Sequence, residues 1–175
     1  MSFFIFATFL YFFILFHNLY YIFKEVNNTK KYRISENTLA IIPMGDNNSL
    51  IYEVDKMLVI NNKPNNIIKS NCILDGSSYQ IRVDYSRNIT GNMYKSPIVL
   101  NNNIIFFPTC SPRLKEVSWI NIESINKLSI NKDNKSSIIE LINGNQLYFK
   151  ESLWTLNNQI LKASRFEFLL RKKDA

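Results

Sequence analysis

The sequence of 175 residues has little of the chemistry that enzymes use. Its single histidine, His17, lies in an apolar N-terminal run, so the serines and cysteines elsewhere have no imidazole base. The four glycines form neither a G-x-x-x-x-G-K-[ST] loop nor a G-x-G-x-x-G turn, which excludes the usual phosphate cradles and dinucleotide fingerprints. We interpret the scattered carboxylates as solvated surface. The sequence therefore predicts no catalytic residues, no cofactor and no enzymatic activity.

Cysteine is scarce as well. Cys72 and Cys110 are the only two, and they form no C-x-x-C pair. Neither a disulfide framework nor a metal site is indicated. Both residues are predicted to be reduced, buried thiols.

Acidic residues are outnumbered, with 14 Asp and Glu against 21 Lys and Arg, which gives a net charge of +7. An excess of this size permits binding to a nucleic acid but does not require it. The length leaves room for one domain with a real core, predicted at residues 32–173.

Charge is missing altogether from residues 3–23, a run of 21 residues of which eight are Phe. As a helix rising ~1.5 Å per residue, this run would cross a ~30 Å hydrocarbon layer. Three interpretations of segment 1–23 remain open. It is a transmembrane helix, or a buried core segment, or it is not part of the native protein because the true start codon lies near Leu19 or Ile22 and the DNA upstream of that codon has been translated. The lysines that follow it would keep the body of an anchored protein in the cytoplasm. A membrane is a partner only if residues 1–23 are translated.

The first half of the body alternates short apolar runs with polar breaks. Runs at residues 38–43, 50–54 and 57–60 predict an antiparallel meander. Residues 65–74, preceded by Pro64, fit a short helix. Residues 79–89 fit a half-buried strand or a helix, and we favour a helix with an apolar stripe of Ile81, Tyr85 and Ile89. Ser77 or Ser78 would cap its start, and Gly91 would end it.

The second half predicts two hairpins and a closing helix. The first hairpin is predicted from apolar runs at 97–100 and 104–108, which flank three asparagines. Residues 120–130 are predicted to be a strand region with a helical turn at 121–124. The second hairpin is predicted from runs at 137–142 and 146–149, which flank Asn143-Gly144. The closing helix follows an N-cap at Ser152. Its apolar face would be Leu153, Leu156, Ile160, Ala163 and Phe166. The predicted fold class is α+β, a single domain with a mainly antiparallel β-sheet and a few helices, including a C-terminal one. The aromatic residues predicted in its core are Phe106, Phe107, Trp119 and Trp154.

Several unusual local motifs follow one another between Cys72 and Trp119. Cys72 stands four residues before Gly-Ser-Ser-Tyr79, and a basic residue, Arg82, follows. Next come Lys95-Ser-Pro-Ile98, an aromatic pair before Pro108-Thr-x-Ser111, and finally Trp119-Ile120. In order and spacing these motifs resemble the ComK family, the competence transcription factors of low-GC Gram-positive bacteria. The resemblance covers roughly residues 32–163.

The resemblance implies a function that composition does not show. ComK-like proteins activate DNA-uptake genes from the cytoplasm, in association with the nucleoid, and recognise paired A-tract and T-tract boxes in double-stranded DNA from the minor groove. It implies a homo-oligomer, a dimer or a pair of dimers, with RNA polymerase and a proteolytic adaptor as further partners. A-tracts narrow the minor groove and deepen its negative potential, which favours inserted arginine.

The candidate DNA contacts follow from this resemblance. Arg82 comes first, because it matches a basic residue of the family's central motif. Arg87, Lys95, Lys69, Arg113 and Lys115 are candidate phosphate contacts, and Ser77, Ser78 and Tyr79 are candidate hydroxyl and backbone donors. The alternatives are a turn with a helix cap at 76–78, a core position for Tyr79 and a solvated surface position for Arg82.

Two departures from the family pattern leave other functions open. Ser96 stands in place of a family proline, and Gln80-Ile81 replace a Gly-rich stretch. A diverged ComK paralogue with weakened DNA binding would fit these changes. The other alternative is a membrane-anchored β-rich protein-interaction module, in which segment 1–23 is a real anchor.

Overall fold

The computed structural model describes residues 26–27, 31–91, 94–100, 103–132 and 135–173. The predictions made for segment 1–23 lie outside these residues. Within the described part, every helix is too short or too polar to span a bilayer.

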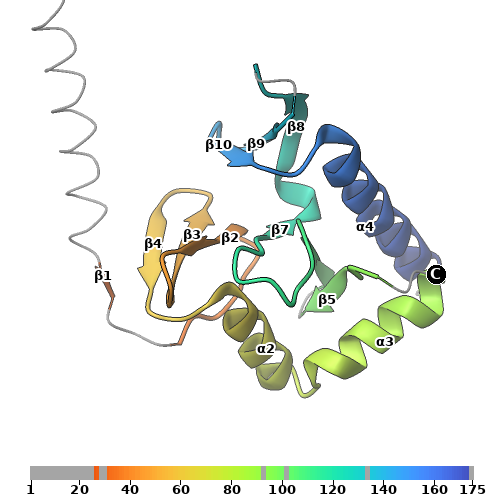
Figure 1. Cartoon of the computed structure of the whole chain (residues 1–175). Coiled ribbons are helices and arrows are strands. Elements are labelled where there is room, and N and C mark those ends of the chain that lie inside the picture. Colours follow the sequence, from red (N-terminus) through yellow and green to blue (C-terminus); the bar gives the residue numbers. More distant parts are fainter. Residues whose placement is uncertain (1–25, 28–30, 92–93, 101–102, 133–134, 174–175) are drawn as a thin grey trace, which may run out of the picture.

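Two sheets form the body of the protein (Figure 1). The larger has seven strands in the order β1-β4-β3-β2-β7-β6-β5, and β1 alone pairs in parallel. The smaller sheet has the order β10-β9-β8. The strands are β1 (Val26–Asn27), β2 (Thr38–Met44), β3 (Asn48–Glu53), β4 (Met57–Ile60), β5 (Ile98–Leu100), β6 (Ile104–Pro108), β7 (Trp119–Asn121), β8 (Ile125–Ile130), β9 (Ser137–Leu141) and β10 (Gln146–Phe149). The predicted meander is β2–β3–β4, and both predicted hairpins, β5–β6 and β9–β10, are confirmed.

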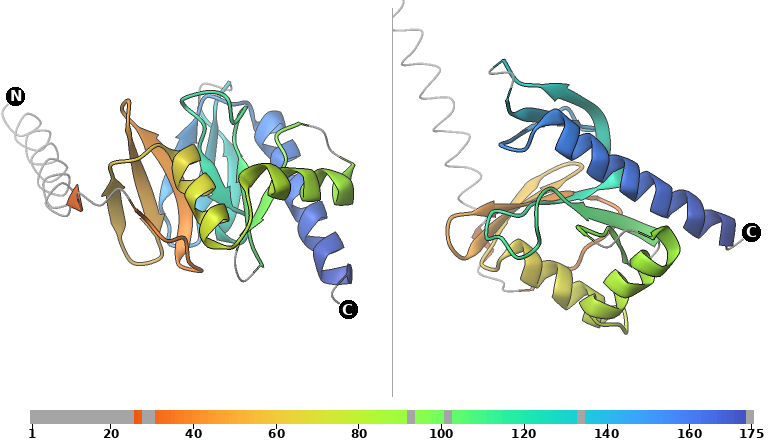
Figure 2. Two further views of the ribbon diagram at one scale, coloured as in Figure 1. Left: turned by 90° about the horizontal axis from the view of Figure 1, so that it is seen from below. Right: turned by 45° about the vertical axis from the view of Figure 1, so that its right-hand side comes forward.

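Three helices cover the larger sheet: α2 (Pro64–Leu74), α3 (Tyr79–Thr90) and α4 (Leu153–Lys173). Helices α2 and α3 lie on one face, and α4 and the smaller sheet lie on the other (Figure 2). In β6, Ile104 and Phe106 belong to the first core cluster, and Ile105 and Phe107 belong to the second. Because both faces of this strand are buried, its sequence is apolar without alternation. The predicted α+β class is confirmed.

The strand region predicted at 120–130 is divided between the two sheets. A 3₁₀ turn, η2 (Ile122–Ser124), separates β7 from β8. The Asn121 side chain accepts a hydrogen bond from Glu123 N (3.1 Å), and Ser124 Oγ donates to Leu39 O (3.0 Å). These polar side chains redirect the backbone and satisfy its buried groups, so one apolar stretch serves two sheets.

Helix α3 confirms the favoured reading of residues 79–89. Ser78 Oγ accepts from Ile81 N (3.2 Å) at its start, and Gly91 ends it at φ 71°. The predicted apolar stripe is wrong at Ile81, whose side chain is 62% exposed. The other two stripe residues, Tyr85 and Ile89, pack against the second core cluster as predicted, and the helix also buries Val83, Ser86 and Thr90. Thr90 Oγ1 donates back to Ser86 O (2.8 Å). The partly buried Tyr85 ring meets Phe166 edge to face, with centroids 6.3 Å apart.

Helix α4 begins after Ser152, whose Oγ accepts from Thr155 N (3.3 Å). Its buried residues are Leu156, Gln159, Ala163, Phe166 and Leu170, so Leu153 was wrongly predicted on this face. Phe106, Phe107 and Trp119 are fully buried as predicted, but the core prediction for Trp154 is wrong because its side chain is 75% exposed. Trp154 belongs to the outward face of α4 with Leu161 and Phe168, which are 58% and 66% exposed.

Both cysteines are free and buried, as predicted. Burial raises the pKa of Cys72 and of Cys110 to about 11. Each side chain therefore remains a protonated thiol near neutral pH and serves as a small apolar group.

Candidate nucleic-acid interface

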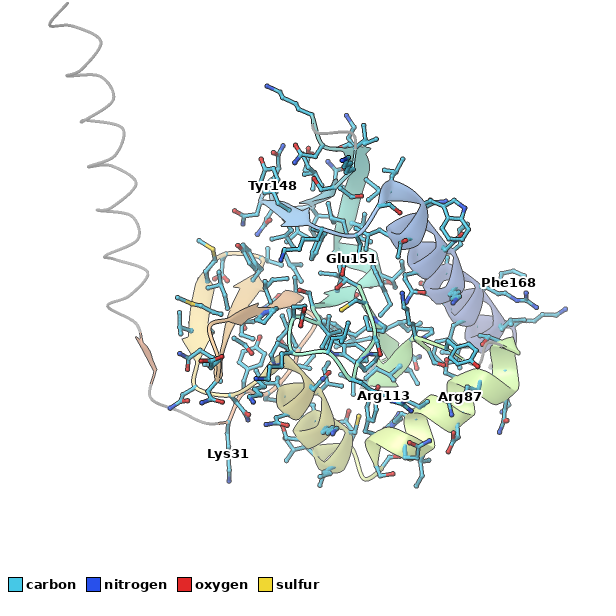
Figure 3. The ribbon with its side chains drawn as sticks, viewed as in Figure 1. Lys31, Arg87, Arg113, Tyr148, Glu151 and Phe168 are labelled. Carbon is cyan, nitrogen blue, oxygen red and sulfur yellow. The ribbon has the colours of Figure 1, made fainter. Side chains whose placement is uncertain are left out.

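A groove of about 620 Å³ opens between α2, α3, the segment that enters β5 and the loop that joins β6 to β7. Four cationic residues line it: Lys69, Arg87, Lys95 and Arg113. The other lining residues are Asn65, Tyr79, Gln80, Val83, Tyr94, Ser96, Ser111 and Pro112, so none of the lining residues is acidic. Figure 3 labels Arg87 on α3 and Arg113 on the loop, which lie close together in that view.

The loop that carries Arg113 is closed at its base by Thr109. Thr109 N donates to Ser118 O (3.0 Å), and Ser118 N donates back to Thr109 Oγ1 (3.3 Å). At the turn, Arg113 N donates to Ser111 Oγ (3.4 Å). The Pro-Thr-x-Ser motif therefore has a structural purpose, because it shapes the loop that presents Arg113.

Asn65 ties this loop to the first turn of α2. Trp119 Nε1 donates to Asn65 Oδ1 (2.8 Å), and Asn65 Nδ2 donates to Pro112 O (2.6 Å). The buried indole, the helix and the loop are thus joined through one amide. Asn65 could not be identified from the sequence, because an asparagine in an Asn-rich chain gives no signal of its own.

Tyr79 lies between the core and the groove. Its ring meets Trp119 edge to face, with centroids 6.1 Å apart, and Lys69 Nζ lies 6.0 Å from the Tyr79 ring centroid. Burial raises the pKa of Tyr79 to about 12, so the hydroxyl keeps its proton. The ring therefore packs in the core as one of the two predictions had it, and the role of its hydroxyl as a donor to DNA stays a prediction.

Helix α4 adds a cation beside the groove. Lys162 Nζ donates to Tyr94 O (3.3 Å), and Gln159 Nε2 donates to Lys95 O (3.3 Å) and Pro108 O (3.0 Å). Burial, together with the nearby charge of Lys95, lowers the pKa of Lys162 below its ordinary value. Lys162 was missed because the sequence places it 67 residues from Lys95.

The cations around the groove are weakly neutralised. Arg87 Nη1 pairs with Asp84 Oδ1 at 3.2 Å, and Asp84 is half exposed. Lys69, Lys95 and Arg113 form no ion pair with any other residue that the structure describes. Like charges held together in this way raise the local positive potential, which attracts a polyanion.

Arg82 lies apart from the groove, although it was the first candidate. It lines a separate hollow of about 590 Å³ together with Arg33 and Ser77. Its Nη2 donates to Asp75 O (3.3 Å), and Asp75 Oδ1 accepts from Arg33 Nη2 (2.8 Å). Asp75 is the C-cap of α2, where backbone carbonyls concentrate negative charge, so Arg82 helps to join α2 to α3.

The structure therefore gathers part of the predicted set. Lys69, Tyr79, Arg87, Lys95 and Arg113 line one groove. Ser77 lies in the other hollow, Ser78 caps α3, and Lys115 is exposed on the loop but does not line the groove.

Replacement of Arg82 by alanine should separate its two possible roles. We expect unfolding free energy to fall by roughly 1 kcal/mol, because a hydrogen bond to the α2 C-cap is lost. We expect affinity for duplex DNA to change less than twofold, since the groove stays intact. Urea unfolding and a salt-titrated gel shift measure the two quantities, with Arg113→Ala as the comparison. A tenfold loss of affinity in Arg82→Ala would instead make Arg82 a DNA contact.

The fold and this interface define an α+β protein with a cationic groove. The chain matches the ComK protein family over residues 29–175 and belongs to that family. It is 26% identical, over 140 residues, to the competence transcription factor of Bacillus subtilis (strain 168). That alignment covers 77% of this chain and 72% of the relative. No solved structure matches the chain significantly. Family membership confirms the prediction of a non-enzymatic protein.

Proposed function

We propose that this protein is a DNA-binding transcriptional activator of competence genes that recognises AT-rich promoter boxes. The groove lined by Lys69, Arg87, Lys95 and Arg113, with no acidic lining residue, supports this function most directly. Four cations in one concave surface suit the phosphates that flank a DNA groove. Membership in the ComK family, and likeness to a relative named a competence transcription factor, supply the regulatory role.

The preference for AT-rich boxes has a physical rationale in the same groove. A-tracts have a narrow minor groove with a deep negative potential, and arginine is the side chain that this potential favours. Arg87 and Arg113 are the arginines available at the groove. The proposed place of action is the cytoplasm, at the nucleoid, where the activator would meet RNA polymerase. A proteolytic adaptor remains a further partner implied by the family.

Binding-site selection on random duplexes tests this proposal. We expect enrichment of paired A-tract and T-tract boxes, because shape readout adds to the phosphate contacts. Competition with heparin and with mixed-sequence DNA provides the control. Equal, weak binding to every polyanion would contradict the proposed specificity and would favour a diverged paralogue.

We infer that copies of the chain associate through the outward face of α4. Trp154, Leu161 and Phe168 recur at intervals of seven residues and are 75%, 58% and 66% exposed. Seven residues are nearly two helical turns, so the three side chains form one line along α4. At ~150–250 Å² for each of the four aromatic side chains in two copies, the association would bury roughly 600–1,000 Å², the size of a weak interface.

Leu161→Glu tests this association, because it places a charge at the centre of the line. We expect the dimer dissociation constant to rise at least tenfold, as a buried unpaired carboxylate is costly. Analytical ultracentrifugation over a concentration series measures it, with Ser164→Glu as a control at the edge of the same face. A wild-type protein that stays monomeric at high concentration would refute the inference.

A further inference from the structure

We propose that Tyr94 is a base-contacting residue whose ring wedges between adjacent base pairs of the bound duplex. This inference rests on the proposed function and adds a role that the cations cannot perform. Tyr94 lines the groove, and its side chain is 81% exposed, the highest value among the large apolar side chains of the described residues. A ring exposed at the rim of a cationic groove can stack on a nucleobase.

The backbone that presents Tyr94 is held in an unusual conformation. Lys95 has φ 49°, and among the described non-glycine residues only Asn103 also has a positive φ. A left-handed lysine costs free energy, and such residues persist where the surrounding structure imposes them. Immediately after it, Ser96 and Pro97 are buried, which anchors the end of the segment.

Hydrogen bonds from helix α4 hold the backbone of Tyr94 and Lys95 in this conformation. Lys162 Nζ donates to Tyr94 O (3.3 Å), and Gln159 Nε2 donates to Lys95 O (3.3 Å). Gln159 is itself only 2% exposed, so its amide is firmly placed. Both carbonyls of the segment are thus tied to one helix. The outward position of Tyr94 is therefore built into the fold.

The neighbours of Tyr94 are suited to hold a sugar-phosphate backbone. Lys95 and Arg113 line the same groove, and Lys162 lies beside it. If these cations hold the phosphates of both strands, the base pairs that lie between the strands come against the exposed Tyr94 ring. An aromatic or apolar wedge enters most easily at flexible pyrimidine–purine steps such as TA, which AT-rich duplexes contain. Tyr94 would therefore add a preference for such steps.

The test compares Tyr94→Ala, Tyr94→Leu and Tyr94→Phe with a matched exposed tyrosine, Tyr148→Ala. Tyr148 is 65% exposed on β10, in the smaller sheet away from the groove (Figure 3). Fluorescence anisotropy at several salt concentrations gives the affinity and its salt slope for a duplex that the wild-type protein binds. 2-Aminopurine placed at each step of that duplex reports local unstacking.

We expect Tyr94→Ala to weaken binding roughly 5- to 150-fold, the range seen when a stacking aromatic is removed, with an unchanged salt slope. The 2-aminopurine signal at one step should disappear in Tyr94→Ala and persist in Tyr94→Leu and Tyr94→Phe. Tyr148→Ala should match the wild type. Affinity within twofold of wild type in Tyr94→Ala, or a lowered salt slope, would overturn this inference alone. A wild-type protein that binds no duplex would overturn the proposed function as well.

Discussion

Replacing Lys69, Lys95 and Arg113 together by alanine is expected to weaken duplex binding about 500-fold at ~0.1 M salt, because each lost phosphate contact contributes a factor of about 8. The salt slope should fall by about 2.7 at the same time. These three cations line one groove and form no ion pair with another described residue. Their removal should therefore leave the fold intact.

The control for this variant has the same change in net charge at another surface. Lys127, Lys132 and Lys150 are exposed in and around the smaller sheet, away from the groove. Their joint replacement by alanine should alter affinity far less, since only long-range charge is lost. Equal losses in both triple variants, measured by anisotropy at matched salt, would show that net charge and not the groove binds DNA.

Trp119→Ala is expected to lower the free energy of unfolding by about 3–5 kcal/mol, the usual cost of removing a large buried aromatic side chain. Trp119 is fully buried, packs against Tyr79 and donates to Asn65 Oδ1 at 2.8 Å. The loss falls within the ~5–15 kcal/mol that stabilises a typical domain. Urea unfolding followed by circular dichroism measures it.

Two further tryptophan variants separate packing from hydrogen bonding. Trp119→Phe keeps an aromatic ring but leaves Asn65 Oδ1 without its indole donor, so we expect a smaller loss of about 1–3 kcal/mol. At a protein concentration where the chain is monomeric, Trp154→Ala should change stability by less than about 0.5 kcal/mol, because Trp154 is 75% exposed. Similar losses at Trp119 and Trp154 would contradict the packing that the structure shows.

The helix α3 and the hairpins could be predicted because their signals are local. Ser78 caps the helix start, Gly91 adopts the left-handed conformation that ends it, and Gly144 does the same in the β9–β10 turn. A cap or a turn depends on a few neighbouring residues, so its sequence pattern is sufficient. The aromatic core was only partly predictable, because hydrophobicity alone does not distinguish the buried Trp119 from the exposed Trp154.

The candidate interface shows a similar division. Lys69, Arg87, Lys95 and Arg113 could be named from the sequence because they lie near recognisable motifs. Their common groove could not, since it depends on how α2, α3 and two loops pack. Arg82 matched the family motif best, yet the structure places it at the C-cap of α2. Lys162 lies beside the groove only because α4 packs where its Nζ can donate to Tyr94 O.

By itself, the sequence determined the α+β class, the order of strands and helices from β2 to α4, the lack of recognisable catalytic motifs and the resemblance to one family. Each of these depends on residue type, spacing or local conformation. Tertiary structure decided which cations share a groove, which aromatic side chains face water and why Lys95 adopts a positive φ. These depend on contacts between residues far apart in the chain, such as Gln159 with Lys95, and no local pattern encodes such a contact.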